Sequence, residues 1–269
     1  MSKKTIIGVV VYFVIVIAIM LLLIPVENKN IRYKKWGSLA ELAETDPKAE
    51  FIIENEELYT EDILDLYYNK GKDIEFVYNY AFHKDAYDTM SFTVDELNSE
   101  DVPKLYMSDP RWAYEYLDTT TISENGCSCV AIAMAHLYLY KDGMVDPVIV
   151  SRAAKELGAI GKPEGIVITE TSAVIEALNM NVEGVNCGID IEPVPVEHDE
   201  LIEILDDKDA VLLTAVSSPE FGNHMIVIRD YCDDGYYIND PASPEKSEKV
   251  WPFEEIDDYI TYYWKVTKK

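Results

Sequence analysis

The stretch from Cys127 to Tyr140 constrains the fold most, because it has to form a helix that is buried on nearly all sides. It reads CSCVAIAMAHLYLY, contains no Pro or Gly, and follows the polar turn Ser123-Glu124-Asn125-Gly126. An apolar face this broad is typical of a helix in the middle of a domain. Cys127 stands in the first turn, where unpaired N–H groups and the helix dipole favour a thiolate. The position suits a nucleophile, although most buried cysteines only pack.

The charge of the chain argues against nucleic-acid binding. The 269 residues carry a net charge of −27, and residues 36–269 hold 17 basic and 49 acidic residues. Such a surface repels phosphate backbones. We therefore expect no nucleic acid among the partners and attribute the acidity mainly to solubility. The hydrophobic content of 48% is enough to build a core and excludes wholesale disorder.

An uncharged segment near the N-terminus predicts a membrane anchor. Thr5 to Val26 comprises 22 residues without a charge, enough to cross the ~30 Å hydrocarbon core as a helix. A cleaved signal peptide is the alternative, but its apolar region is usually shorter, and no small-x-small cleavage site follows. The basic residues Lys29, Arg32, Lys34 and Lys35 argue against export of the C-terminal side. The acidity of the rest of the chain argues for it, and we expect a single-pass protein of the cell membrane with its main domain outside the cell.

Beyond the anchor, residues 1–26, we predict an acidic helical lead-in, residues 27–100, and a main domain, residues 101–269. In the lead-in, residues 38–43 and 58–68 place apolar residues at helix spacing. Residues 74–80 fit either the end of a helix or a strand. In the main domain, further helices are expected at 148–157 and 172–178, and a buried strand at 210–216. Helices first and strands afterwards indicate an α+β fold.

Two β-rich runs around a turn place a histidine and an aspartate together. His224 opens the first run, Asp240 closes the second, and Asp233-Asp234-Gly235 lies between them. Residues equidistant from a hairpin turn lie side by side. With Cys127 at a helix start, these are the parts of a Cys-His-Asp triad, in which the thiolate attacks, the imidazole carries the proton and the carboxylate fixes its tautomer. Either His224 or Asp240 alone would more often be a structural residue.

The remaining cysteines point to no further site. Cys127 and Cys129 are two apart on a helix and cannot form a disulfide. Cys187 and Cys232 could form one, and the sequence leaves this open. A zinc site at the Cys-x-Cys pair and His136 lacks a second pair of ligands. We therefore expect no metal and no cofactor.

Four sequence blocks occur in the order seen in a known family. They are Ser108–Trp112, Gly126-Cys127 with Ala131–Met134, Asn223–Val227 and Asn239–Ser243. The chain thereby resembles papain-like cysteine peptidases of the bacteriocin-leader (double-glycine) type, the peptidase C-thirty-nine-like family, many of which are membrane-anchored or secreted proteins of Gram-positive bacteria. Tyr59–Tyr80 and Val250–Phe253 are also similar. The resemblance implies a papain-like fold with a central helix packed on an antiparallel sheet, and a peptide or protein substrate.

The same resemblance implies roles for individual residues. Cys127 matches the nucleophile, His224 the general base and Asp240 the orienting carboxylate. The family usually has a Gln two residues before the Asp of its Asp-x-x-Trp block, where its amide helps to form the oxyanion hole. Here that position is Met107, and a thioether cannot donate a hydrogen bond. The N–H of Cys127 remains as a donor, whereas Ser108 is expected to point away in an extended segment.

These observations support one main hypothesis and two alternatives. The main hypothesis is a membrane-anchored, externally facing cysteine peptidase that cleaves a peptide bond through an acyl-thioester on Cys127, weakened by Met107. The first alternative is a papain-like module that has lost turnover and binds peptide or cell-wall material. The second is another acyl transfer, such as transpeptidation or amidase action on cell-wall peptide. We do not expect the double-glycine specificity, because no ATP-binding or transporter segment follows in the sequence.

Overall fold

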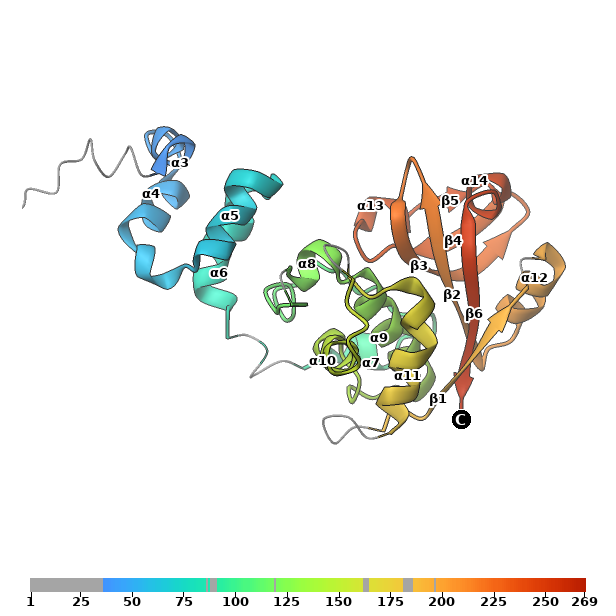
Figure 1. Ribbon diagram of the computed structural model, residues 1–269. Coiled ribbons are helices and arrows are strands. Elements are labelled where there is room, and N and C mark those ends of the chain that lie inside the picture. The colour runs from blue at the N-terminus through green and yellow to red at the C-terminus, as the bar shows by residue number, and fades with distance from the viewer. Residues whose placement is uncertain are drawn as a thin grey trace, which may run out of the picture. The chain divides into compact units, whose positions relative to one another are not determined.

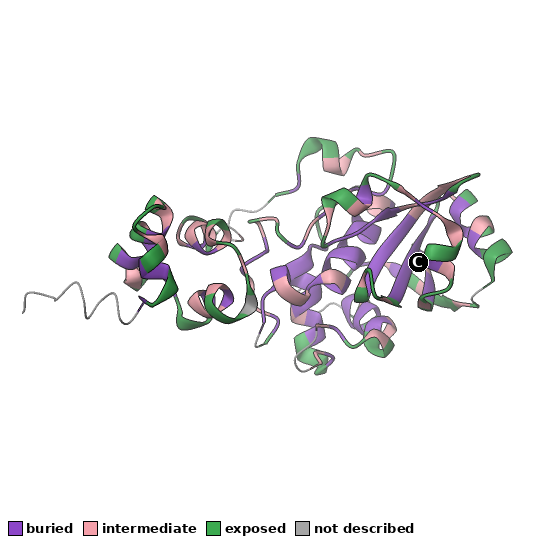
Figure 2. Ribbon diagram, turned by 90° about the horizontal axis from the view of Figure 1, so that it is seen from above, coloured by how far each residue is buried: buried purple, intermediate pink, exposed green. Residues whose placement is uncertain are grey.

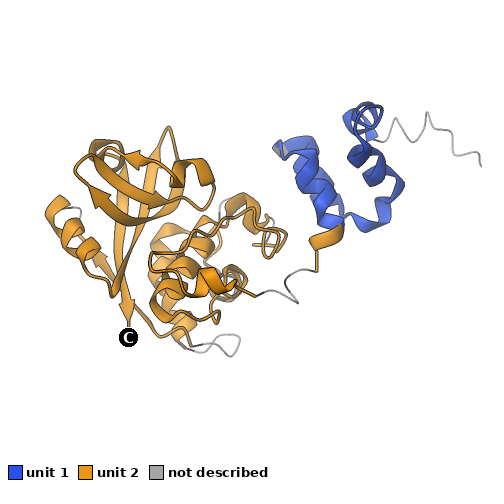
Figure 3. Ribbon diagram, turned by 180° about the vertical axis from the view of Figure 1, so that it is seen from behind, with its two compact units in different colours: residues 1–81 blue, residues 82–269 orange. Residues whose placement is uncertain are grey.

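The computed structural model describes residues 36–85, 87, 91–118, 120–161, 165–180, 186–195 and 197–269. Thr5–Val26, the predicted membrane anchor, lies outside these residues. Among the residues described, no helix combines the length and the apolar character needed to cross a membrane. The chain divides into two compact units after Ala81 (Figure 3). The border at residue 100 between lead-in and main domain remains a prediction.

The described part of the first unit consists of short helices. They are α3 (Ser38–Leu42), α4 (Pro47–Glu54), the 3₁₀ turn η1 (Glu56–Leu58), α5 (Glu61–Lys70) and α6 (Ile74–His83), which continues to the start of the second unit. Local sequence sets their starts: the Asp46 side chain accepts a hydrogen bond from the Lys48 N–H, and Thr60 caps α5 in the same way. The segment 74–80, which fitted either a helix or a strand, is helical throughout.

The second unit is built on one six-stranded sheet. Its strands are β1 (Ile189–Val194), β2 (Ala210–Ser218), β3 (Gly222–Cys232), β4 (Gly235–Asn239), β5 (Val250–Trp251) and β6 (Ile260–Lys268). They lie in the order β1-β6-β2-β3-β4-β5, and every neighbouring pair is antiparallel. The last strand in sequence, β6, therefore lies between the first two. Helices combined with an antiparallel sheet confirm the predicted α+β fold.

Helices cover both faces of this sheet (Figure 1). In chain order they are α7 (Val94–Leu97), α8 (Ile122–Asn125), α9 (Cys127–Tyr140), α10 (Pro147–Leu157), η3 (Ile168–Glu170), α11 (Thr171–Asn179), α12 (His198–Asp206), α13 (Pro244–Ser247) and α14 (Phe253–Asp257). Side chains alternate between the faces of a strand. Leu213 of β2 accordingly packs in the core with α9, α10 and α11, and its neighbour Leu212 packs in the core with α12 and α14.

Helix α9 is the central element of the larger core, as its sequence predicts. Its side chains are buried from Ser128 to Leu137, and Leu139 is buried as well; Figure 2 shows the buried interior to which this helix belongs. The helix ends at Tyr140, and the left-handed backbone of Lys141 (φ 55°) terminates it. A helix without a polar face is stable only inside a protein. This burial fixes the start of α9, and with it Cys127, against the sheet.

Candidate active site

Cys127 is held at the junction of two helices. The short helix α8 begins with a capping box, in which Thr121 and Glu124 satisfy each other's backbone N–H groups. Gly126 joins α8 to α9 and must be glycine, because a Cβ atom there would lie 2.5 Å from the carbonyl oxygen of Ile122. Among the described residues, no side chain caps the start of α9. No side chain therefore competes with a ligand for the first N–H groups of α9, which include that of Cys127.

His224 and Asp240 are brought together by an irregularity in the β3–β4 hairpin. The two strands pair Cys232 with Gly235, and a bulge between Ile228 and Asp230 shifts the register by one residue, so that Val227 pairs with Asn239. Asp240 consequently lies opposite Ile226. Because Ile226 is two positions after His224, His224 and Asp240 lie on the same face of the sheet. The His224 Nε2 and Asp240 Oδ1 atoms are 2.6 Å apart.

Asp240 is a buried carboxylate with fixed partners. It is 1% exposed, and Oδ1 also accepts a hydrogen bond of 2.7 Å from the Ala242 N–H. Its own N–H donates to Ser247 Oγ at 2.9 Å. The sequence analysis missed Ala242 and Ser247, although an Asp that accepts from the N–H two residues later is a common turn pattern. These bonds hold the carboxylate in one orientation toward His224.

Cys127 and His224 form a polar pair at the base of a cleft. Because Nε2 of His224 bonds to Asp240, Nδ1 is the ring nitrogen that remains for the Cys127 thiol, with which His224 shares a hydrogen bond. Burial raises the pKa of Cys127 because it disfavours the thiolate. The hydrogen bond and the charge of His224 lower the pKa of Cys127. Hydrogen bonds of the Met225 N–H and the Ser128 hydroxyl lower it further. The net result is a lowered pKa for Cys127.

The pKa of His224 moves in the other direction. Burial lowers it, but the hydrogen bonds and charges of Asp240 and Cys127 raise it to about 10. A thiol with a lowered pKa next to an imidazole with a raised pKa favours a thiolate–imidazolium pair over the neutral pair. Papain-type thiols reach low pKa values through this kind of pairing.

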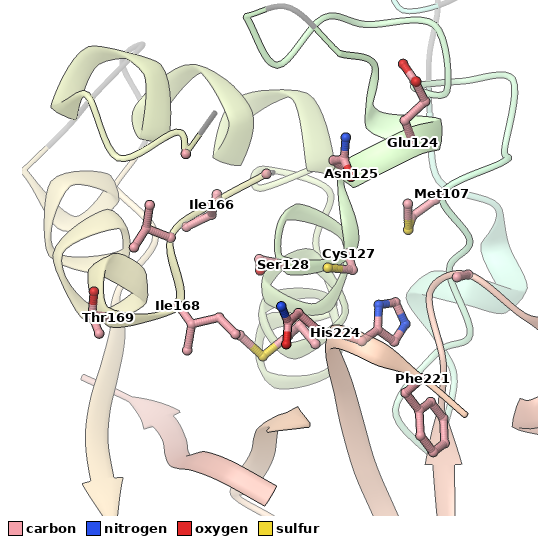
Figure 4. A pocket seen from close by; sticks show the side chains of 16 residues that line it. Met107, Glu124, Asn125, Cys127, Ser128, Ile166, Ile168, Thr169, Phe221 and His224 are labelled. Atoms are coloured by element: carbon pink, nitrogen blue, oxygen red, sulfur yellow. The ribbon is translucent and has the colours of Figure 1, made fainter. Parts of the chain in front are cut away.

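Met107 occupies the edge of the cleft beside this pair (Figure 4). It is 6% exposed, and its backbone N–H donates to the Pro241 carbonyl at 2.8 Å. Its main chain is thus tied to the residue after Asp240, and its side chain presents a thioether to the cleft. Ser108 is exposed and is not among the residues that line the cleft. It offers no hydrogen bond in place of Met107.

The rest of the Ser108–Trp112 block has a structural role. Arg111 forms ion pairs of 2.6 Å with both Asp109 and Glu96, and its guanidinium lies 4.5 Å from the centre of the Trp112 ring. The Trp112 indole N–H donates to the carbonyl of Tyr106 at 2.7 Å. These contacts hold the chain on both sides of Met107 in place.

The cleft around Cys127 has a volume of about 620 Å³. Figure 4 shows Cys127 and Ser128 at its base, with Ile166, Ile168 and Thr169 on one side and His224 and Phe221 on the other. The segment from Gly165 to Thr169 was not predicted, because it is too short and irregular to show a helix or strand period. A cleft of this size that contains a polar pair is suited to a small segment of a larger ligand.

The other cysteines lie apart from this site. All four cysteines are free, so Cys187 and Cys232 do not form the disulfide that the sequence left open. Cys129 is fully buried in the core, and burial raises the pKa of its thiol. Within the described ranges, no group of three or more His, Cys, Asp or Glu residues is arranged to hold a metal ion.

Comparison with known proteins identifies the family of the chain. A model of the Peptidase_C39 like family matches residues 106–269, which is more than half of the chain. The match does not include Tyr59–Tyr80, where the resemblance remains a prediction. Comparisons with curated proteins and with solved structures return no match. The family model covers all four sequence blocks, together with Cys127, His224 and Asp240, and the chain therefore belongs to the Peptidase_C39 like family of cysteine peptidases.

Proposed function

We propose that the protein is a papain-like cysteine peptidase that hydrolyses a peptide bond, with Cys127 as nucleophile, His224 as general base and acid, and Asp240 as the carboxylate that orients His224. The observation that carries this proposal is the 2.6 Å contact between His224 and Asp240 beside Cys127 in a cleft of about 620 Å³. Nucleophile, base and orienting group are the three parts that acyl transfer to a thiol requires.

In the first half of the reaction, the Cys127 thiolate attacks the carbonyl carbon of the substrate. The negative charge moves to the carbonyl oxygen, where the Cys127 N–H at the start of α9 is a donor. The His224 imidazolium then gives its Nδ1 proton to the amide nitrogen, and the carbon–nitrogen bond breaks. The products of this half are an amine and an acyl-thioester on Cys127.

In the second half, water replaces the amine. Neutral His224 takes a proton from the water as it attacks the thioester carbonyl, and the carbon–sulfur bond breaks to release a carboxylic acid. The thiolate and the imidazolium are thereby restored. Asp240, held by Ala242 and Ser247, keeps the ring in one orientation throughout both halves.

The pH dependence of thiol alkylation tests this proposal. Because the pKa of Cys127 is lowered and that of His224 is raised to about 10, the reactive pair is populated between the two values. We expect alkylation of Cys127 by a neutral haloacetamide to be fast already near neutral pH, and to slow only as the pH falls through the lowered pKa of Cys127. An ordinary thiol gains reactivity around pH ~8.5. Peptide mapping by mass spectrometry measures each cysteine separately.

Cys232 is the internal control for this experiment, because it is a half-exposed free cysteine that does not line the cleft. In the His224→Ala variant, the imidazole no longer lowers the pKa of Cys127, whereas burial still raises it. The pH profile of Cys127 alkylation should therefore move to higher pH. A wild-type Cys127 that reacts no faster than Cys232 at neutral pH would overturn the proposal.

One observation favours a second candidate function. Met107 lines the cleft at the position of the expected oxyanion donor and offers only a thioether. A protein with a thiolate–imidazolium pair but a poor oxyanion hole could bind a peptide or cell-wall segment without turning it over. Tight peptide binding with rapid alkylation of Cys127 and no hydrolysis, even over long incubation, would favour this binding module.

We also propose that a helix within Thr5–Val26 anchors the protein and that the cleft faces the outside of the cell. This proposal is supported by the uncharged segment and by the acidity of the remaining chain. An epitope tag placed after Lys269 should be stained by antibody on intact cells. Staining that requires permeabilised cells would reverse the orientation, and recovery of the tag in the culture medium would indicate cleavage after the segment.

A further inference from the structure

The ladder of paired residues that joins β3 to β4 stops before it reaches the catalytic pair. Its last pair is Val227 and Asn239. His224 lies three positions before Val227, and Asp240 lies one position after Asn239. On its other side, β3 stays paired with β2 as far as Gly222. Among the residues described, the loop that begins at Asp240 therefore forms no ladder with the first residues of β3, and other contacts must keep the two segments together.

The bonds described so far fix the shape of this loop but not its distance from β3. Asp240 binds Ala242 and Ser247, which belong to the loop itself. The Pro241 carbonyl accepts from the Met107 N–H, which lies outside β3. These bonds make the loop a defined unit. They would allow it to move away from the start of β3 as one piece.

Lys246, in α13, connects this loop to the turn between β2 and β3. Its ammonium nitrogen donates a hydrogen bond of 2.6 Å to the main-chain carbonyl of Glu220, and it lies 4.5 Å from the centre of the Phe221 ring. The Glu220 carboxylate is 3.4 Å away and 60% exposed, so the ion pair itself contributes little. Among the residues described, the hydrogen bonds that connect the loop to the β2–β3 hairpin are that of Lys246 and that between His224 and Asp240.

Neighbouring aromatic rings restrict the position of Lys246. The Phe221 ring packs on that of Trp251 with centroids 4.8 Å apart, and the Trp251 indole N–H donates to the Lys246 carbonyl at 2.9 Å. The Lys246 N–H donates to the Ser243 hydroxyl at 3.2 Å, and its side chain is only 23% exposed. An ammonium group is attracted to the face of an aromatic ring. Figure 4 shows Phe221 on the His224 side of the cleft, so the connection lies beside the general base.

We propose that Lys246 is a positioning residue of the catalytic pair. By binding the Glu220 carbonyl, it holds the loop that carries Asp240 against the start of β3. It thereby keeps Asp240 within hydrogen-bond distance of His224. The inference rests on the proposed peptidase function and adds a residue to it. Lys246 does not line the cleft, and it acts through the catalytic pair because a displacement of about 1 Å at a catalytic group can cost ~10²-fold in rate.

The first test is peptide hydrolysis by variants of the full-length protein in detergent. Lys246→Met removes the ammonium group and keeps an unbranched apolar side chain. We expect it to lower kcat by about 3- to 10-fold, as for the loss of one hydrogen bond. KM should stay within about twofold, because Lys246 does not touch the substrate. Lys246→Arg keeps a charged donor and should restore kcat to within about twofold. An unchanged kcat in Lys246→Met overturns the proposal.

The matched control is Lys249→Met. The Lys249 ammonium lies 3.8 Å from the centre of the Trp251 ring, so it makes the same kind of ring contact three residues further along. It forms no hydrogen bond with the β2–β3 turn in the described part of the chain. Lys249→Met and Glu220→Gln, which keeps the main-chain carbonyl, should both leave kcat within about twofold, since neither removes the bond in question. A loss in Lys249→Met as large as that in Lys246→Met would overturn the assignment.

The pH profile separates positioning from a general loss of stability. Burial lowers the pKa of His224, but the hydrogen bonds and charges of Asp240 and Cys127 raise it to about 10. If Lys246→Met loosens Asp240, the pKa of His224 falls. Because His224 must be protonated to give its proton to the leaving amine, the alkaline limb of kcat/KM should move to lower pH. Lys249→Met should not move it. A limb at the same pH in Lys246→Met as in the wild type would contradict the proposal.

A measurement without substrate tells failure of this inference apart from failure of the proposed function. The proton between His224 Nε2 and Asp240 Oδ1 should give a downfield proton NMR resonance, identified by its absence from His224→Ala. We expect this resonance in the wild type and in Lys249→Met, and its broadening or loss in Lys246→Met. Its loss in Lys246→Met, in a protein that cleaves no peptide, supports positioning without the peptidase. A sharp resonance in Lys246→Met refutes positioning whether or not peptides are cleaved, and its absence from the wild type refutes the contact itself.

A thermal unfolding curve of each variant shows whether it is folded at the assay temperature. If Lys246→Met is not, Lys246→Gln takes its place in all three measurements. The glutamine side chain is one atom shorter than that of lysine and carries no charge, so it cannot reproduce the 2.6 Å bond to the Glu220 carbonyl. The same results are expected, and the same results would overturn the proposal.

Discussion

Replacing Cys127 by alanine is expected to remove peptide hydrolysis by this protein. His224→Ala should lower kcat by ~10⁴-fold or more, and Asp240→Asn by ~10⁴-fold, the scale found when members of related triads are removed. The physical reason is that the nucleophile, the proton carrier and the group that fixes its tautomer act as one unit. The measurement is the rate of product formation from a cleaved peptide, and the double variant Cys127→Ala with His224→Ala should be no worse than the single variants.

The control for this prediction is Cys129→Ala. Cys129 lies two residues along α9, is fully buried and does not line the cleft, so its thiol takes no part in the proposed reaction. Its loss should cost stability, measured as a lower midpoint of thermal unfolding, with kcat nearly unchanged. If Cys129→Ala abolished activity in a folded protein while Cys127→Ala retained it, the nucleophile would be wrongly assigned.

Restoring an amide at position 107 is expected to increase turnover. Met107→Gln would place a donor at the edge of the cleft beside Cys127, where charge develops on the carbonyl oxygen. The loss of one such donor in other enzymes costs ~10²–10³-fold in kcat, and a gain of up to that size is expected here. Because the Met107 N–H is fixed on Pro241, the backbone should keep its course. The gain should appear in kcat more than in KM, since the bond forms in the transition state.

The matched control is Met107→Leu, which keeps an apolar side chain of similar volume. It should leave kcat unchanged, because it adds no donor. If Met107→Gln and Met107→Leu both behaved like the wild type, a donor other than the side chain at position 107 would be serving the oxyanion. If Met107→Gln converted an inert protein into an active one, the natural protein would be a binding module that retains an intact thiolate–imidazolium pair.

The parts of this site that rest on local patterns could be predicted from the sequence. The buried helix from Cys127 and the hairpin around Asp233-Asp234-Gly235 both appear at their expected places, because each depends on residues close together in the chain. The prediction brought His224 and Asp240 only to within a few residues of each other. The bulge after Ile228 decides the final register, and it has no sequence signature of its own.

Other parts depend on contacts between distant segments, which a local pattern does not specify. Strand β6 has the β-branched and aromatic residues of a strand, but its place between β1 and β2 follows from packing. The cleft wall at Ile166 rests on one isolated bridge to Ile160 and on the close approach of Gly165 to Asn125. The residues that form this cleft wall were therefore the ones that sequence reasoning did not find.

The bulge in β3 also restricts how this chain can vary in length. His224 and Asp240 share a face because the bulge sets the register of the paired residues of β3 and β4 that lie between them. A single codon gained or lost within β3 or β4 would turn the carboxylate to the far side of the ribbon. One codon gained in each of the two strands, or a change confined to the turn at Asp233-Asp234, would preserve the pairing. Natural length variation in this hairpin should accordingly accumulate at its tip.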